Sequence, residues 1–332
     1  MDDCTFSQVK IASFVIPIYR NEENLPQLVE SLVAIKSKLG VQIEAVFVVD
    51  GSPDNSWNWL TTNEVLLNEF RCHFILLSRN FGALSAVRRG LRQAQGDAIC
   101  VFAADGQEPV DLLIQMAEEV LNGHEVVVGI REDRTDPFVT KTLSLLFWKV
   151  FRLVGGREFP RRGVDVFAIS RRVSATLLEL MESSTSLVGL IYWAGFDRKE
   201  IPYVRKKRLV GKSSWTFRKR AKYALDSITS FSEAPLIVLI VLGLFGFVAS
   251  TLFGLYVLLN QVVRSSSPPG YTPLLMGIAI VASTQLLSSG VLGMYLWRVS
   301  ENVRRRPVTV DWKTVQSIPE TESNPTTSKV FE

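Results

Sequence analysis

Residues Ile11 to Ile18 read IASFVIPI, a continuous apolar run with a proline near its end. A short apolar run without polar alternation is typical of a parallel strand that is buried on both faces. Beyond Asn24 the apolar residues change to helical spacing, at Leu25, Leu28, Val29, Leu32 and Ile35. The beginning of the chain therefore predicts a buried strand followed by a helix with one apolar face.

The same pattern of strand and helix repeats along the chain. Further strands are expected at residues 44–49, 74–77, 99–103 and 126–129. Polar clusters follow three of these strands, at residues 50–56, 78–82 and 104–109. Strands that alternate with helices at this spacing predict an α/β fold with a parallel sheet and crossover helices. Ligands of such folds bind at the carboxyl ends of the strands, where these polar clusters lie.

The composition indicates that a membrane part follows the α/β part. Hydrophobic residues make up 47% of the 332 residues and charged residues 21%, a combination that requires segregation of the apolar residues. No charged residue lies between Glu233 and Arg264, or between Arg264 and Arg298. We expect transmembrane helices at about 236–259 and 272–297, because each stretch is long enough to cross about 30 Å of hydrocarbon. Buried helices of a soluble domain are the alternative.

The charges around these two stretches predict their orientation. The first ten residues are polar and acidic, unlike a secretory signal peptide. Basic residues concentrate at 205–222 and 298–306, whereas the loop 260–271 holds one arginine. The positive-inside rule then assigns both termini to the cytosol. We expect an integral membrane protein with two spans, in the inner membrane of a bacterium.

Four segments result from this division. Residues 1–215 are expected to form the α/β domain, and residues 234–300 the two spans. Residues 216–233 mix basic and apolar side chains, which predicts an amphipathic helix in the headgroup layer, with a solvated connecting helix as the alternative. Residues 301–332 form a cytosolic tail that is polar beyond Asp311, and we expect part of it to be disordered.

The rare residues exclude some classes of site. Cys4, Cys72 and Cys100 are widely spaced in the part expected to be cytosolic, which favours reduced thiols over disulfides. His73 and His124 have no spacing typical of zinc ligands. The net charge of +4 is small, and its clustering before the first span indicates a phosphate ligand or an anionic membrane surface. No nucleic-acid partner is expected.

Six motifs between residues 11 and 215 occur together in one order. They are Val15 to Asn24 (VIPIYRNEEN), Val49 to Ser56 (VDGSPDNS), Ser78 to Gly82 (SRNFG), Gly96-Asp97, Ala103 to Pro109 (AADGQEP), and Arg205 to Arg208 (RKKR) with Gly211 to Ser213 (GKS). In this order the chain resembles family-2 glycosyltransferases of the polyprenyl-phosphate group, which are similar to dolichyl-phosphate-mannose synthase. The resemblance implies a GT-A fold, which is Rossmann-like with a mostly parallel sheet, followed by two transmembrane helices.

The resemblance also implies a donor site. Its donor-binding residues are Pro17, Tyr19, Asp50, Arg79 and Asp105. Asp105 and Gln107 match the metal motif of the family and imply Mg²⁺ or Mn²⁺, a hard cation that meets the charge of a nucleotide-diphosphate leaving group. From the residues alone, Asp105 could be an ordinary turn aspartate, Asp50 a helix-capping residue, and Arg79 a partner in a surface salt bridge.

On the acceptor side the resemblance implies a lipid phosphate. Its expected ligands are Arg131, Arg134, Arg205, Arg208, Lys212 and Ser213, because guanidinium groups and hydroxyls match phosphate oxygens. Attraction to anionic lipids would also explain this basic cluster. Asp165 matches the acceptor-side catalytic aspartate. A lipid monophosphate is already mostly ionised at neutral pH, so Asp165 would orient the acceptor or act as a weak base, with a structural hydrogen bond as the alternative.

Three positions depart from the family pattern, and each loses an acid. The family commonly has Asn-Glu where this chain has Arg20-Asn21, paired aspartates at Val49-Asp50, and Asp-x-Asp at Ala103 to Asp105. Because Asp105 and Gln107 are retained, we expect an active enzyme with an altered donor pocket. An inactive paralogue that still binds the donor is the alternative.

These observations predict a hexosyltransferase. It would move a sugar from a nucleotide-diphosphate sugar to a polyprenyl phosphate of the undecaprenyl or dolichyl type, at the cytosolic face of the lipid bilayer and with inversion. The alternatives are a saccharide-extending transferase and a noncatalytic membrane scaffold that binds the same ligands. Glycines in both expected spans would permit close helix packing, so a homo-oligomer is also compatible with the sequence.

Overall fold

In the computed structural model the chain divides into two compact units. The structure describes residues 10–132, 164–180, 186–206, 271–304 and 307–319, with isolated helical residues between 241 and 256. One unit comprises residues 1–224 together with 307–332, and the other comprises residues 225–306. The last part of the chain therefore returns to the first unit.

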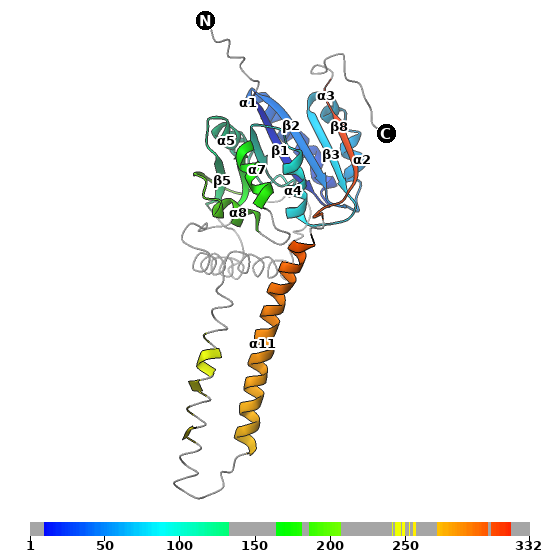
Figure 1. Ribbon diagram of the computed structural model, residues 1–332. Helices are drawn as coiled ribbons and strands as arrows, with labels where there is room; N and C mark the ends of the chain where they lie inside the picture. Colours follow the sequence, from blue (N-terminus) through cyan, green and yellow to red (C-terminus); the bar gives the residue numbers. More distant parts are fainter. Residues whose placement is uncertain are drawn as a thin grey trace, which may run out of the picture. The chain divides into compact units, whose positions relative to one another are not determined.

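The first unit is built on one sheet of eight strands, in the order β7-β5-β6-β4-β1-β2-β3-β8 (Figure 1). The strands are β1 (Ile11–Ile18), β2 (Gln42–Val49), β3 (Arg71–Leu77), β4 (Ala98–Val101), β5 (Val126–Arg131), β6 (Val164–Ser170), β7 (Arg198–Tyr203) and β8 (Asp311–Ser317). The helices of this unit are α1 (Leu25–Leu39), α2 (Ser56–Thr61), α3 (Glu64–Glu69), α4 (Ala83–Gln93), α5 (Val110–Leu121), α7 (Arg171–Leu180) and α8 (Leu187–Trp193).

The predicted α/β fold is confirmed, and the first run of the sequence forms β1 with its expected bounds. β1 pairs in parallel with β2 on one side and β4 on the other, and β2 pairs in parallel with β3. Both faces of these strands are covered, by α4 and α7 on one side and by α1 and α5 on the other. Burial on both faces explains why the strands read as apolar runs.

The mostly parallel sheet that the resemblance implies is confirmed, and its parallel order is interrupted by β6 at one side. β5 does not lie beside β4, because β6 is inserted between them and is antiparallel to both. β7 then pairs in parallel with β5. As a result the amino end of β6 meets the carboxyl ends of β4 and β5 at the same edge of the sheet.

α4 lies close to the sheet because of Gly90. A Cβ atom at this position would lie 2.4 Å from Cγ1 of Val15 and 3.3 Å from Cγ2 of Val48. Real atoms do not approach this closely, so a larger residue would push the helix away from the sheet. The position of α4 matters for the site, because the loop before it carries the motif Ser78 to Gly82.

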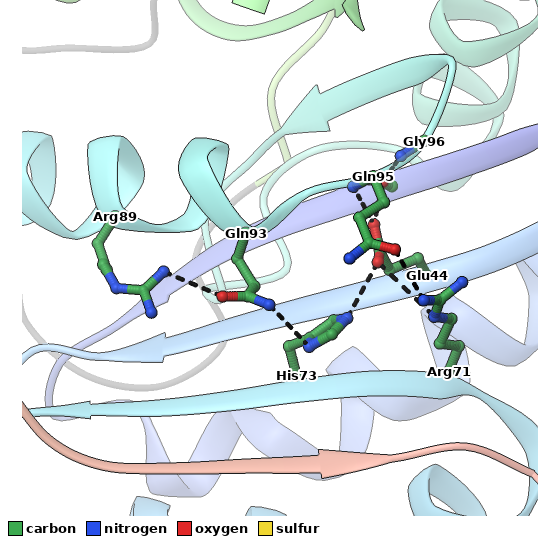
Figure 2. A network of polar contacts seen from close by, with 8 residues as sticks. Glu44, Arg71, His73, Arg89, Gln93, Gln95 and Gly96 are labelled. Atoms are coloured by element: carbon green, nitrogen blue, oxygen red, sulfur yellow. Dashed lines mark hydrogen bonds and ion pairs between the residues drawn. The ribbon is translucent and has the colours of Figure 1, made fainter. Parts of the chain in front are cut away.

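A buried polar network links three strands to the end of α4 (Figure 2). Glu44 in β2 is fully buried, and its Oε1 lies 3.0 Å from Nε2 of His73 in β3. Its Oε2 accepts hydrogen bonds from the Ser13 hydroxyl in β1 and, at 2.7 Å, from the backbone N–H of Gln95. These bonds, the one from His73 first among them, lower the pKa of Glu44 although burial opposes them.

The network has a definite direction of hydrogen bonding. Arg89 donates to Oε1 of Gln93 at 3.2 Å, and Nε2 of Gln93 lies 3.2 Å from Nδ1 of His73. Arginine only donates, so the amide of Gln93 must present its NH₂ group to His73. The ring of His73 then accepts at Nδ1 and donates from Nε2 to Glu44.

The expectation for the tail is corrected at residues 311–317. These residues form β8, which pairs antiparallel with β3 at the end of the sheet. The segment is polar because most of its side chains are exposed, and it adds to the sheet through its backbone. Periodic burial, the signal on which sequence analysis depends, is therefore weak in this strand.

The second unit contains the helix α11 (Tyr271–Val303). Residues Ile280–Trp297 within it form the one stretch, among the residues that the structure describes, that is long and apolar enough to cross a membrane. Several of its large apolar side chains are more than half exposed, including Leu286, Leu292 and Leu296. The expected first span, 236–259, and the expected interfacial helix, 216–233, lie largely or wholly outside the described residues.

Candidate active site

Most of the described candidate residues lie at one edge of the sheet. β1 to β5 and β7 all end at this edge, so the loops that follow these strands lie along it. Asp50 follows β2, Arg79 follows β3, Asp105 follows β4, and Arg205 follows β7. The carboxyl edge of a parallel sheet is where α/β enzymes bind ligands.

Asp50 binds the loop that precedes α4. It is 2% exposed, and its carboxylate accepts from the backbone N–H of Phe81 at 2.6 Å and of Gly82 at 2.8 Å. The side chain of Asn80 also donates to it at 3.0 Å. Asp50 thus binds the residues directly before α4, which belongs to the next βα unit.

Gly51 allows this close approach. Its φ is +55°, and a Cβ atom would lie 2.2 Å from the carbonyl carbon of Arg79. Both the backbone angle and the lack of space exclude a side chain at this position. The motif Asp50-Gly51 therefore holds the ends of β2 and β3 together.

The loops after β1 and β2 are also joined. The N–H of Arg20 donates to the hydroxyl of Ser52 at 2.8 Å, and the N–H of Glu22 donates to Asp54 at 3.1 Å. Hydrogen bonds from Ser52, Ser56 and Glu22 lower the pKa of Asp54, although burial opposes them. Arg20 has a φ of 55°, a strained value for a residue with a side chain.

The other expected donor residues lie on the same side of the edge. Pro17 pairs with Val48 inside the sheet, and Tyr19 directly follows β1. The guanidinium of Arg79 lies 4.2 Å from the centre of the Phe81 ring, and that of Arg20 lies 5.5 Å from the ring of Tyr19. Each of these two loops therefore holds one arginine against an aromatic ring.

Asp105 lies next to a residue that the sequence assigned to the acceptor. It is 5% exposed, and its Oδ2 lies 3.8 Å from Nη2 of Arg205. Gln107 binds the segment after β7 twice. Its backbone carbonyl accepts from the N–H of Lys206 at 2.9 Å, and its side-chain amide donates to the Lys206 carbonyl at 3.1 Å. The expected metal residues and one expected acceptor residue are thus neighbours.

Glu108 is the residue that sequence reasoning missed. It is 6% exposed, its carboxylate oxygens have no hydrogen-bond partner, and Oε1 lies 3.6 Å from Nη2 of Arg205. Burial raises its pKa to about 7, helped by the nearby charge of Asp105 and opposed by Arg205 and Arg131. An acid directly before a proline, three residues beyond Asp105, was the available signal.

Tyr203 at the end of β7 completes this cluster. Burial raises the pKa of its phenol, and the charge of Glu108 adds to that effect, while the charge of Arg131 opposes it. Its ring lies close to Gly129 in β5, where a Cβ atom would be 3.2 Å from the ring. We call Asp105, Glu108, Arg131, Tyr203 and Arg205 the acidic-basic cluster.

The remaining candidates are only partly described. Asp165 lies in β6 between Val164, which pairs with Ile130, and Val166, which pairs with Gly129, where the register shifts. This backbone position is at the same edge of the sheet, next to the end of β5. The side chain of Asp165 lies outside the described residues, as do Arg134, Arg208, Lys212 and Ser213.

The described residues offer oxygen donors for a divalent cation, but few of them are carboxylates. No group of three or more His, Cys, Asp or Glu side chains in the described part of the chain could hold a metal ion. Mg²⁺, however, commonly takes only one or two carboxylates and completes its shell with substrate phosphates and water. Asp105, Gln107 and the carboxylate of Glu108, which lacks hydrogen bonds, are donors of the right kind for such a site.

Comparison with known proteins identifies the family of the chain. Residues 13–175 match the family described as glycosyl transferase family 2. The chain is 31% identical to an uncharacterized glycosyltransferase of Synechocystis over 89% of this chain and 93% of that protein. It is 30% identical to an uncharacterized glycosyltransferase of Bacillus subtilis, over 89% and 91%. A prophage-derived bactoprenol glucosyl transferase of Shigella flexneri is 29% identical, over 89% and 95%.

Proposed function

The chain belongs to glycosyl transferase family 2 and is a glycosyltransferase, and from this premise we propose that it transfers a hexose from a nucleotide-diphosphate sugar to a polyprenyl phosphate. The acceptor is inferred from the bactoprenol glucosyl transferases that align with nearly the whole chain. Bactoprenol is a polyprenyl lipid, so the proposed acceptor is an anion attached to a membrane. The proposal rejects the noncatalytic scaffold considered from the sequence.

The observation that carries the proposal is the contact between Asp105 and Arg205. Two phosphate groups must meet in this reaction, one in the leaving nucleotide and one in the acceptor. Asp105 and Gln107 are proposed for the donor side, and Arg205 and Arg131 for the acceptor side. An ion pair 3.8 Å long between the two sets supports a site in which donor and acceptor are held next to each other.

The protein groups are proposed to act by binding and orientation. Asp50 and the loop Ser78 to Gly82 form a rigid side wall for the nucleotide, with Pro17, Tyr19 and Arg79 beside it. Asp105 and Gln107 would hold Mg²⁺ or Mn²⁺, which supplies positive charge to the leaving diphosphate. Arg131 and Arg205 are proposed to receive the acceptor phosphate, together with Arg134, Arg208, Lys212 and Ser213.

Asp165 is proposed to orient the attacking phosphate oxygen. Its backbone lies beside the end of β5, because the preceding residue, Val164, pairs with Ile130, the neighbour of Arg131. An acceptor monophosphate is largely ionised at neutral pH, so orientation contributes more than proton removal. A single displacement of this kind inverts the configuration of the sugar carbon.

The membrane part is proposed to hold the enzyme at its lipid substrate. α11 supports one span at Ile280–Trp297, and the uncharged stretch 236–259 is proposed as the other. Basic residues concentrate at 205–222 and 298–306, which supports a cytosolic position of both termini under the positive-inside rule. The proposed location is a bacterial inner membrane, and association into a homo-oligomer through the small residues of the spans is part of the same proposal.

The test is a transfer assay with the full chain in detergent. Radiolabelled UDP-sugars and GDP-sugars are each incubated with undecaprenyl phosphate or dolichyl phosphate, with Mg²⁺, with Mn²⁺, or with a chelator. The expected result is a labelled lipid with one donor, which forms only when a divalent cation is present. The configuration of the released sugar then tests inversion.

Two outcomes would contradict the proposal. A labelled water-soluble saccharide in place of a labelled lipid would indicate a saccharide-extending transferase. Lipid labelling that is unaffected by the chelator would remove the metal from the proposal and leave Arg205 as the positive charge near Asp105.

A further inference from the structure

The strand β8 has attachments that the transfer reaction does not explain. Its side chains are mostly exposed, and Trp312 is 67% exposed, so burial of apolar surface does not account for its position. Instead it binds through its backbone to β3 and through one charged side chain to α4. Specific contacts of this kind indicate a role for the position of the strand.

The backbone contact lies at the beginning of the donor-side loop. The N–H of Ser78 donates to the carbonyl of Val310 at 2.9 Å. Ser78 is the first residue after β3, and the next residues, Asn80 to Gly82, bind Asp50. Val310 therefore holds the entry to the loop.

The charged contact lies on the helix that follows the loop. Nε of Arg89 in α4 donates to both carboxylate oxygens of Asp311, to Oδ2 at 2.8 Å and to Oδ1 at 3.1 Å. The side chains are only 17% and 31% exposed, so solvent screens this pair less than a surface ion pair. Asp311 therefore holds the helix into which the loop runs.

Arg89 also connects this contact to the buried network. The same guanidinium donates to Gln93, which continues to His73 and Glu44 inside the sheet (Figure 2). A side chain with bonds on both sides has few other orientations. Arg89 is thus held ready for Asp311, and less conformational entropy is lost when the pair forms.

We propose that Val310 and Asp311 form a clamp that holds the loop Ser78 to Gly82 in the shape that binds the donor. Asp311 is a positioning residue, because it acts through Arg89 and α4 and not by touching the donor. The inference rests on the proposed function in one respect, since that function assigns the donor to this loop. It adds a role for the C-terminal segment, which lies more than 200 residues from the loop in the sequence.

The clamp predicts a specific kinetic result for Asp311→Asn. Loss of the charge weakens both hydrogen bonds from Arg89, and bonds to charged groups of this kind correspond to about a tenfold change in an equilibrium. We expect KM for the nucleotide sugar to rise about tenfold while kcat stays within about twofold. Lys313→Gln is the matched control, because it removes an exposed charge from the same strand and should leave both constants unchanged.

A second variant tests whether the effect passes through the ion pair. Arg89→Met removes the other partner, and the double variant Arg89→Met with Asp311→Asn removes both. If the pair acts as a unit, the double variant raises KM no more than Arg89→Met alone. Additive effects of the two single changes would overturn the clamp.

Amide hydrogen exchange on the full chain gives a readout that needs no turnover. In Asp311→Asn, residues 78–82 should exchange faster, while β1 and β2 keep their protection. Unchanged exchange and unchanged KM would overturn the clamp, and so would an equal loss of protection throughout the sheet. If the wild-type chain transferred no sugar to lipid, the proposed function would fail, but faster exchange of the loop together with weaker binding of UDP or GDP would still support the clamp.

Discussion

Asp50 and Glu108 are both buried acids at the carboxyl edge of the same sheet, yet their surroundings differ. The carboxylate of Asp50 accepts two backbone hydrogen bonds and one from a side chain, all within 3.0 Å. The carboxylate oxygens of Glu108 accept none, and the guanidinium of Arg205 lies 3.6 Å away. We name two parts of the edge after these two carboxylates, the saturated half around Asp50 and the unsaturated half around Glu108.

The difference in hydrogen bonding distinguishes an acid that stabilises the fold from an acid that is available to a ligand. A buried carboxylate with its hydrogen bonds made stabilises the fold, as in Asp50 and in Glu44 at the opposite edge. A buried carboxylate without them costs free energy, and the raised pKa of Glu108 expresses that cost. Such a cost persists at functional sites, where an incoming ligand makes the missing contacts.

The largest expected effect is on catalysis in the unsaturated half. Asp105→Asn should lower kcat/KM for lipid labelling by about a hundredfold to a thousandfold, because the charge that meets the donor is lost. The transfer assay measures this. Asp97→Asn is the control, since Asp97 precedes the same strand, β4, at the opposite edge. Full turnover of Asp105→Asn at saturating metal would contradict a role of Asp105 in the site.

The next effect is on stability in the saturated half. Asp50→Ala leaves three donors without their acceptor, at about 1 kcal/mol each, so the free energy of unfolding should fall by about 3 kcal/mol. Unfolding of the full chain in urea, followed by tryptophan fluorescence, measures the change. Asp111→Ala removes an exposed acid on α5 and should change stability by less than about 0.5 kcal/mol. An equal loss in both variants would show that saturation of Asp50 is unimportant.

Glu44→Gln tests whether saturation or position matters, because Glu44 lies away from the site. We expect a loss of about 2 kcal/mol at pH 7 without a change in KM. The pKa of Glu44 is lowered in the folded state from its ordinary 4.5, so its contribution is present above that pH and is lost as the pH falls through the folded pKa.

The stability difference between Glu44→Gln and the wild type should therefore shrink in acid. Unfolding curves from pH 7 down to pH 3 measure it, with Glu69→Gln, an exposed acid, as the control. A difference that grows in acid would contradict the lowered pKa.

The smallest effect is expected for Glu108→Gln, and its sign is opposite. Removal of a buried charge that lacks hydrogen bonds should leave stability unchanged or raise it by about 1 kcal/mol at pH 8. Transfer should nevertheless fall by about tenfold, because Arg205 loses one of its two carboxylate neighbours. A loss of stability like that of Asp50→Ala would remove the distinction between the two halves of the edge.

Much of the fold could be predicted from the sequence because burial leaves a local pattern. The run at Ile11 to Ile18 formed a strand with the expected bounds. α11 begins within one residue of the expected second span. β6 and β8 were missed for different reasons: the strand at Val164 was read only for its motif, and β8 buries little of its surface.

The site was predictable only in part. The motifs identified which strand ends carry polar groups, since strand ends and turns have local signatures. The roles assigned to Pro17, Tyr19, Asp50, Arg79, Asp105, Gln107 and Asp165 stay predictions. Glu108 had no assigned role, because its burial depends on Arg131, Tyr203 and Arg205, which come from strands far along the chain.

By itself the sequence determined the succession of strands and helices, the acids at the strand ends, and one long apolar helix. Each of these follows from residues within a few positions of one another, through periodicity and turn chemistry. Only the tertiary structure decided that Asp50 binds the loop of the next unit, that Arg205 faces Asp105, and that Val310 and Asp311 hold the loop and helix after β3. Those contacts depend on the order and direction of the strands, and the period of a strand is the same wherever it lies in the sheet.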